Sequence, residues 1–141
     1  MKIVNVKIVI IALLFSFAIG CKKDAKDASN SDEYYIKYAV KSNSLPYYGV
    51  KLNTSITNES NQIIQSVINT GDWETTIGPV KSGFLADLSV VKKGWNGGTE
   101  NHLKIALSIS VSKNGSPFAQ KKLDDNNGNA RATASIQYSV E

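Results

Sequence analysis

The sequence contains few of the residues on which catalysis and metal binding most often depend. Its 141 residues include one cysteine, one histidine, one methionine and three prolines. Because there is only one cysteine, no internal disulfide can form, and the fold must be stabilised by its core. Charged residues make up 20% and aromatic residues 9% of the chain, and the formal net charge is +4. This composition is typical of one globular domain and excludes a collagen, a coiled coil and a fully disordered chain.

No arrangement of residues suited to catalysis is evident in the sequence. The only histidine, His102, lies beside Glu100 and Asn101 at the start of a predicted strand, where we expect a solvent-exposed side chain. No serine lies in a G-x-S-x-G nucleophile motif. The sequence therefore predicts a non-enzymatic protein that uses no cofactor, with an unrecognised enzyme or inhibitor as an alternative.

The loop at residues 124–129, Asp-Asp-Asn-Asn-Gly-Asn, is the one cluster with several oxygen ligands for a metal. A calcium loop has alternating acids, a glycine at its sixth position and a distant glutamate. Counting from either Asp124 or Asp125 does not give this register. We therefore expect a loop of turn-forming residues and no metal site, with a weak calcium site as the alternative.

The N-terminus has the pattern of a secretory signal. Lys2 and Lys7 precede an apolar run, Ile8–Ile19, whose only polar member is Ser16. The run is too short to cross a bilayer, which takes a helix of about 20 residues. A charged start followed by a short apolar run is typical of a signal peptide.

The apolar run ends in Ala18-Ile19-Gly20-Cys21, which resembles the lipobox of bacterial lipoproteins. The resemblance implies that cleavage follows Gly20, that the Cys21 thiol becomes a diacylglycerol thioether, and that the new amino terminus is acylated. Two or more acyl chains hold a protein stably on a membrane, whereas one does not. We expect a signal peptide over residues 1–20 and a lipid anchor at Cys21, with a soluble secreted protein or an uncleaved anchor as alternatives.

The residues after the cysteine predict a tether and a location. Residues 22–33 carry seven charges and no large apolar side chain, so we expect residues 21–33 to form a lipidated, disordered tether. Lys22, rather than Asp, follows Cys21. By analogy with lipoprotein sorting this argues against retention in the inner membrane. The predicted location is the cell envelope, at the outer membrane, facing the periplasm or the surface.

The charges that remain after removal of the signal peptide argue against a nucleic-acid partner. Removal of Lys2 and Lys7 with the signal peptide lowers the formal net charge from +4 to +2, and the other basic residues are scattered. A nucleic-acid interface would need a basic patch with interleaved aromatic residues. We expect no nucleic-acid partner.

From Tyr34 onward, apolar and polar residues alternate with the period of two that is typical of half-buried strands. The clearest run has Leu103, Ile105, Leu107, Ile109 and Val111 on one face, and it leads to the hairpin signal Asn114-Gly115. Gly78-Pro79 is expected to stop the fourth run. The predicted strands lie at residues 34–41, 50–57, 63–68, 73–77, 84–90, 102–112, 118–123 and 132–140.

The spacing of these runs predicts an all-β domain over residues 34–141. Seven to eight short strands joined by close turns are best accommodated by an antiparallel β-sandwich, with a partly open β-barrel as the alternative. The last strand needs protection against edge pairing, for which we expect Arg131 to be a modest device.

Three aromatic residues are candidates for ligand binding. Trp95 lies in a glycine-rich loop, residues 92–98, and could stack on a sugar ring or anchor a protein contact. Tyr47 and Tyr48 follow Pro46 and could form an exposed platform. The alternative for all three is packing against the domain, whereas Trp73 alternates with Ile77 and is expected in the core.

The order of motifs is similar to that of a known family. These motifs are a Tyr-x-Lys-Tyr near the start, Trp73-Glu74-Thr75, residues 84–89, a Lys-Asn-Gly hairpin and residues 132–135. Together they resemble the small β-sandwich domain of the mycobacterial small membrane protein (MmpS-like) family. Members of that family are held by a transmembrane helix and assist RND-type transporters, whereas this chain has a lipobox. The expected function is an envelope module for a partner protein or transport assembly, with a surface binder of glycan or another small ligand as the alternative.

Overall fold

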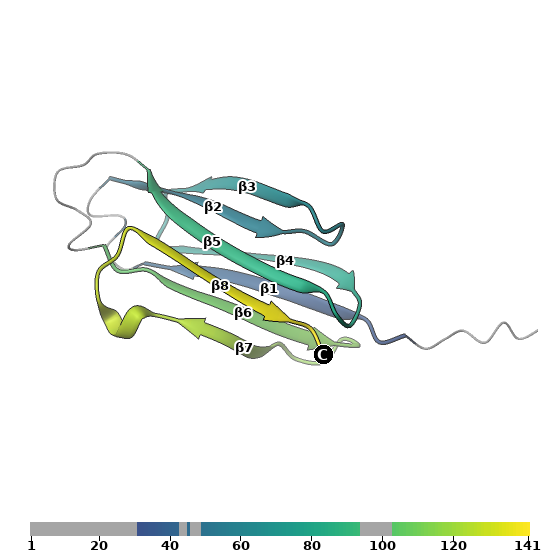
Figure 1. Ribbon diagram of the computed structural model, residues 1–141. Helices are drawn as coiled ribbons and strands as arrows, with labels where there is room; N and C mark the ends of the chain where they lie inside the picture. Colours follow the sequence, from purple (N-terminus) through teal and green to yellow (C-terminus); the bar gives the residue numbers. More distant parts are fainter. Residues whose placement is uncertain (1–30, 43–44, 46–48, 94–102) are drawn as a thin grey trace, which may run out of the picture. The chain divides into compact units, whose positions relative to one another are not determined.

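The computed structural model describes residues 31–42, 45, 49–93 and 103–141. These residues form eight strands in two four-stranded antiparallel sheets, in the orders β4-β1-β6-β7 and β3-β2-β5-β8 (Figure 1). The strands are β1 (Tyr34–Lys41), β2 (Lys51–Thr57), β3 (Ile63–Ile68), β4 (Asp72–Val80), β5 (Leu85–Lys93), β6 (Ala106–Lys113), β7 (Ala119–Asp124) and β8 (Thr133–Ser139).

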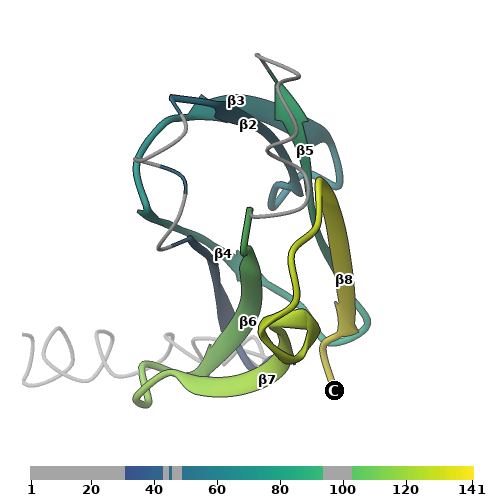
Figure 2. The ribbon, with the colours of Figure 1, turned by 90° about the vertical axis from the view of Figure 1, so that its left-hand side faces the viewer.

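The two sheets lie face to face, as the end-on view shows (Figure 2). No ladder joins one sheet to the other in the part of the chain that the structure describes. The predicted sandwich, rather than the partly open barrel, is therefore the fold. The described residues contain no helix that is both long and apolar enough to cross a membrane.

The core is made by alternate residues of each strand, because successive side chains of a strand point to opposite faces of its sheet. The inward-facing sets of β1, β2, β5 and β6 are those that the alternation predicts, and nearly all are apolar. The buried members in the strands or in the residues just before them are Tyr34, Ile36, Tyr38, Val40, Val50, Leu52, Thr54, Ile56, Phe84, Ala86, Leu88, Val90, Leu103, Ile105, Leu107, Ile109 and Val111.

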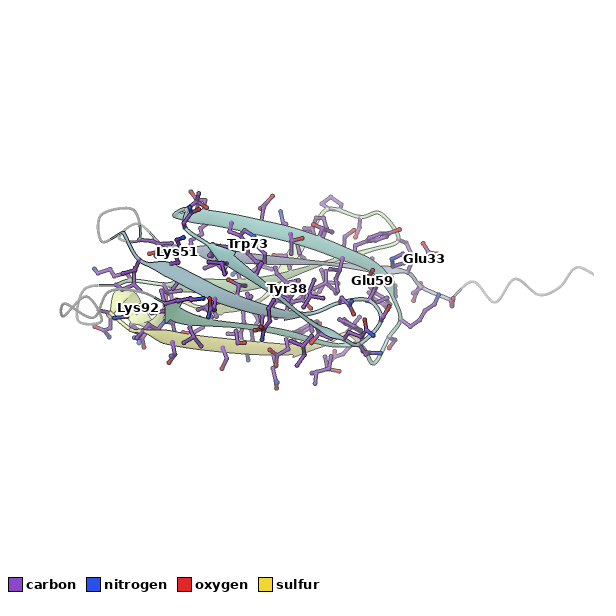
Figure 3. All side chains as sticks on the ribbon, turned by 90° about the horizontal axis from the view of Figure 1, so that it is seen from above. Glu33, Tyr38, Lys51, Glu59, Trp73 and Lys92 are labelled. Atoms are coloured by element: carbon purple, nitrogen blue, oxygen red, sulfur yellow. The ribbon has the colours of Figure 1, made fainter. Side chains whose placement is uncertain are left out.

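Tyr38 links the two sheets across the core. It lies in β1, its side chain is fully buried, and its hydroxyl donates a hydrogen bond of 2.9 Å to the Thr57 carbonyl of β2 (Figure 3). Burial, and then the nearby Asp87 charge, raise the pKa of the Tyr38 hydroxyl well above its usual range. A buried hydroxyl is favourable only when it has a partner, so Thr57 fixes the position of the ring.

The predicted hairpin at Asn114-Gly115 is confirmed. Both residues have positive φ, 51° and 77°, and they connect the paired strands β6 and β7. Residues 31–33, which the sequence places in the disordered tether, instead contact the domain: Asp32 and Glu33 lie against this hairpin, and Ser31 accepts a hydrogen bond from Lys81. Glu33 accepts a hydrogen bond from the Asn114 amide and donates one to the Asn114 side chain.

The expected stop at Gly78-Pro79 is wrong, because β4 continues through both residues to Val80. The strand is at the edge of its sheet, where a proline, which lacks an N–H, is tolerated. The pairing of β4 with β1 shifts in register between Tyr34 and Ile36, and this shift accommodates Gly78 and Pro79 in the strand. Gly78 is required there, since its φ is 131° and a Cβ atom would lie 2.8 Å from the Tyr34 carbonyl oxygen.

Candidate functional site

The residues that the sequence singled out for function lie outside the described residues. These are Cys21, Tyr47, Tyr48, Trp95 and His102. Their roles therefore stay predictions. The site has to be sought among the hollows, charged clusters and strand edges of the described sandwich.

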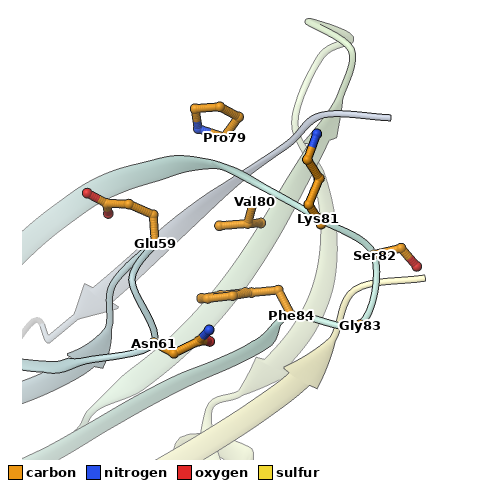
Figure 4. A pocket seen from close by; sticks show the side chains of 8 residues that line it. All are labelled: Glu59, Asn61, Pro79, Val80, Lys81, Ser82, Gly83 and Phe84. Carbon is orange, nitrogen blue, oxygen red and sulfur yellow. The ribbon is translucent and has the colours of Figure 1, made fainter. Parts of the chain in front are cut away.

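One hollow lies at one end of the sandwich, between the β2–β3 turn and the β4–β5 turn (Figure 4). Its volume is about 360 Å³. Val80 and Phe84 are buried, whereas Glu59 and Lys81 are exposed members of the lining. The hollow therefore has a small apolar floor flanked by one acidic and one basic residue, and this arrangement does not indicate a particular class of ligand.

A second hollow contains two tyrosines and lies between β7 and β8; we call it the Tyr34–Tyr138 cleft. Its volume is about 280 Å³. Tyr34 and Val140 are buried, Tyr138 is half-buried, and Lys113 and Lys121 are exposed. Aromatic rings with polar groups beside them are the features that bind a small hydroxylated ligand.

The charges at this cleft are held in place by an ion pair. Lys113 Nζ lies 2.5 Å from Asp32 Oδ2 and 5.4 Å from the centre of the Tyr34 ring, and Asn114 donates a 2.9 Å hydrogen bond to the other Asp32 oxygen. The bond to Lys113 is the main cause that lowers the pKa of Asp32, and the bond to Asp32 likewise raises the pKa of Lys113. Lys113 therefore stays protonated at neutral pH and can act as a hydrogen-bond donor, not as a base.

A third hollow opens between the edges of the two sheets, and we call it the β3–β4 opening. Its lining includes Ile56 of β2, Ile64 of β3 and Trp73 of β4, and its volume is about 230 Å³. Trp73 points to the core side of its sheet, where it is paired with Val40, and it is half-buried. The prediction that Trp73 belongs to the core thus holds for its orientation, while part of the residue stays accessible at the side of the sandwich.

Strand β3, Ile63–Ile68, forms one side of this opening and is the most apolar exposed element of the described chain. It is the terminal strand of its sheet, and five of its six residues are exposed. The exposed fractions are 72% for Ile63, 45% for Ile64 and 54% for Val67. The strand carries no charge and no proline, and its ladder with β2 runs without a register shift.

The other three edge strands have features that discourage pairing with another chain. Strand β4 contains Asp72, Glu74 and Pro79 and has an irregular register, and β7 contains Lys121 and Lys122. Strand β8 is uncharged, but it lies against β7 and β6 of the other sheet. Charges, prolines, bulges and covering elements are the means by which proteins protect sheet edges. Among the described strands, β3 alone has none of them.

Arg131 has a different role from the predicted one. Its side chain is only 13% exposed, and Nη1 lies 2.5 Å from Asp124 Oδ2. Its other guanidinium nitrogens donate to the Ile105 carbonyl at 2.6 and 3.1 Å and to the Asp124 carbonyl at 2.8 Å. The guanidinium thus ties the segment before β8 to the start of β6 and the end of β7. Because Arg131 and Ile105 are 26 residues apart, no local pattern in the sequence shows this contact.

The loop at residues 124–129 uses its carboxylates internally. Asp124 accepts hydrogen bonds from Arg131 and from the Asn126 amide, and Asp125 accepts one from the Asn127 amide. These bonds form a 3₁₀ turn, Asn126–Gly128, as expected for a loop of turn formers. No group of three or more His, Cys, Asp or Glu side chains that could hold a metal occurs in the described ranges.

Comparison with protein-family models, with curated proteins and with solved structures gave no match for this chain. The resemblance to the MmpS-like family therefore stays a prediction. The functional assignment has to rest on the described surface and on the N-terminal sequence.

The tie between Arg131 and Asp124 predicts a pH-dependent stability. The bond to Arg131 is the main cause that lowers the pKa of Asp124 from its ordinary value of 3.8. The stabilisation is therefore fully present above about pH 4 and is lost as the pH falls through the lowered folded-state value. We expect Asp124→Asn to lower the free energy of unfolding by about 1 kcal/mol at pH 7 and Arg131→Met by about 2 kcal/mol.

Urea unfolding at pH 7 and at pH 2.5 measures this effect, with Asp125→Asn as the matched control. The difference between the wild type and Asp124→Asn should shrink at the lower pH, while Asp125→Asn, which leaves the contact between Arg131 and Asp124 in place, should not reproduce the loss at pH 7. An Asp124→Asn effect of equal size at both pH values would contradict the ion-pair account.

Proposed function

We propose that this protein is a lipid-anchored module of a bacterial cell envelope that binds a protein partner and catalyses no reaction. The single observation that carries the binding role is the exposed, uncharged edge of β3 beside the β3–β4 opening. The anchoring role rests on the sequence Ala18-Ile19-Gly20-Cys21 at the end of an apolar run. Assistance to a transport assembly is the form of this role that the MmpS-like resemblance implies.

The apolar character of β3 supports a contact with another protein. An unpaired edge presents backbone N–H and C=O groups to an incoming strand, and exposed apolar side chains add area that association removes from water. Covering exposed side chains such as Ile63 and Val67 with a partner would therefore be favourable. The absence of charge at this edge further favours an uncharged extended partner.

The sandwich also explains how such a module can work at a membrane. Its strands are held by cross-sheet contacts such as Tyr38 to Thr57, so the binding edge does not depend on a ligand for its shape. A covalent lipid at Cys21 would confine this edge to the membrane surface, where its partners would be concentrated.

The anchor is tested by Cys21→Ser. We expect this variant to leave the membrane fraction, because a serine cannot form the thioether and without acyl chains the module has no anchor. Fractionation of cells expressing the full-length chain measures the effect, with Ser16→Ala as a control that keeps the cysteine. Unchanged sedimentation of the Cys21→Ser variant with membranes would contradict the anchor.

The binding edge is tested by site-specific photo-crosslinking in cells. A photoreactive side chain at Val67 in β3 should capture a defined protein, whereas the same group at Thr133 in β8 should not. The two positions are matched, since both lie in one cross-strand row with Asn53 and Val91 at opposite edges of the sheet. Equal capture from both positions, or capture from neither, would count against a partner at β3.

A second candidate function is the binding of a glycan or another small ligand, and the Tyr34–Tyr138 cleft is the observation that favours it. Loss of one stacking ring should weaken binding about tenfold. We therefore expect Tyr138→Ala to reduce binding on a glycan panel, with Phe118→Ala as the control, while Trp95→Ala tests separately the candidate that the sequence alone suggested. Phe118 is 40% exposed but lies against Lys37, outside the cleft. A wild-type protein that binds no glycan on the panel would remove this candidate.

A further inference from the structure

We propose that the occupant of the β3 edge is a second copy of this chain, paired antiparallel through Ile63–Ile68 about a two-fold axis at Gln65. This inference rests on the proposed function, because it names the partner of the β3 edge and depends on the membrane to concentrate the copies. Pairing would join two four-stranded sheets into one continuous sheet of eight strands.

The sequence of β3 is self-complementary in this register. Ile64, Ser66 and Ile68 are paired with the buried residues of β2 and share the inner face, so Ile63, Gln65 and Val67 share the outer face. Directly opposite residues of an antiparallel pair lie on the same face of the sheet. An axis at Gln65 therefore places Ile63 of one copy opposite Val67 of the other and the two Gln65 side chains opposite each other.

Each of these pairs is favourable. The Ile63–Val67 pair occurs twice and would cover two of the most exposed apolar side chains of the described surface. The Gln65 amides can exchange hydrogen bonds, and like charges never meet because β3 has none. An axis at Ser66 is less favourable, because it would leave Ile63 opposite the polar Asn69.

The second copy would also alter the β3–β4 opening. Ile64, Gln65 and Ser66 of β3 line that opening beside Trp73. In the dimer the two β3 strands would lie side by side in one sheet. The inward-facing Ile64 and Ser66 of each copy would then lie beside the β3–β4 opening of the other copy.

The area involved explains why the membrane matters. A single strand pair of five or six residues is smaller than the interface of a stable dimer in solution, which buries more than about 1,000 Å². Confinement by the lipid anchor raises the effective concentration and makes a weak contact productive. The contact is therefore expected between copies on the membrane.

Cysteine crosslinking of the full-length chain in intact cells tests the register. Gln65→Cys places two thiols opposite each other across the axis, and brief oxidation or a short bis-thiol reagent should give a covalent dimer. The yield should be at least about tenfold above that of Ser135→Cys, given the short Cβ separation that a disulfide requires. Ser135 is the matched control, because it lies in the same row as Gln65 at the other edge of the sheet. Ile63→Cys should also give little dimer, since its copies lie about 13 Å apart along the paired strands.

Exchange of charge provides an independent test that does not depend on oxidation. Gln65→Lys and Gln65→Glu each place like charges opposite each other, so copies of either variant carrying two different tags should not co-purify after crosslinking of membranes. Co-expression of the Gln65→Lys variant with the Gln65→Glu variant should restore co-purification. Restoration also shows that both variants are folded.

The outcomes separate this inference from the proposed function. A covalent dimer from the Gln65→Cys variant, without one from the two cysteine controls, supports self-pairing. If the Gln65→Cys variant forms no dimer while the photoreactive group at Val67 captures a different protein, self-pairing is overturned and the binding role is supported. Absence of any product both from the Gln65→Cys variant and from the photoreactive group at Val67 overturns both, because thiol crosslinking alone detects only a partner with a nearby cysteine. A dimer formed by the wild-type chain through Cys21 would show a free thiol and would contradict the anchor, while the charge-exchange test would still decide the edge contact.

Discussion

The structure depends on the period of two of the β-strand. Successive side chains alternate between the faces of a sheet, so a sequence that alternates apolar and polar residues needs another layer against its apolar face, and here that layer is a second sheet. Packing the two sheets together buries their apolar faces, but each sheet still has two edge strands, four in all. Three of the edges are charged, irregular or covered, and the fourth, β3, is a straight and uncharged strand with apolar side chains in solvent. The functional account follows from that difference.

The inward-facing residues could be predicted from the sequence, because the alternation is local. The sets headed by Tyr34 and by Leu103 are both buried as predicted, and Asn114-Gly115 forms the expected connection. Strand ends were less predictable. Gly78-Pro79 does not end β4, since an edge position and a register shift accommodate the proline.

The edges themselves could not be predicted, because the order of strands in a sheet is set by contacts between distant parts of the chain. The run Ile63–Ile68 reads as an ordinary strand, and only its place at the end of the order β3-β2-β5-β8 makes it exposed. Arg131 is a similar case. Its charge suggested an edge function, whereas its guanidinium binds Asp124 and the Ile105 carbonyl. The loop at residues 124–129 was predictable as a turn, because its hydrogen bonds are local.

The proposed anchor and the exposed edge complement each other. An apolar edge in free solution is open to indiscriminate association, whereas the same edge held at a membrane at fixed density meets a limited set of partners. A weak strand contact then becomes dependent on the amount of protein on the membrane. Under this proposal, the module would respond to its own surface density through the β3 contact.

The most direct test of this account is amide hydrogen exchange of the lipidated full-length protein on vesicles, at low and at high surface density. The account predicts that amides of residues 63–68 become more protected at high density, while those of β8 do not change. Equal exchange of β3 at both densities, with the protein still bound to the vesicles, would contradict it.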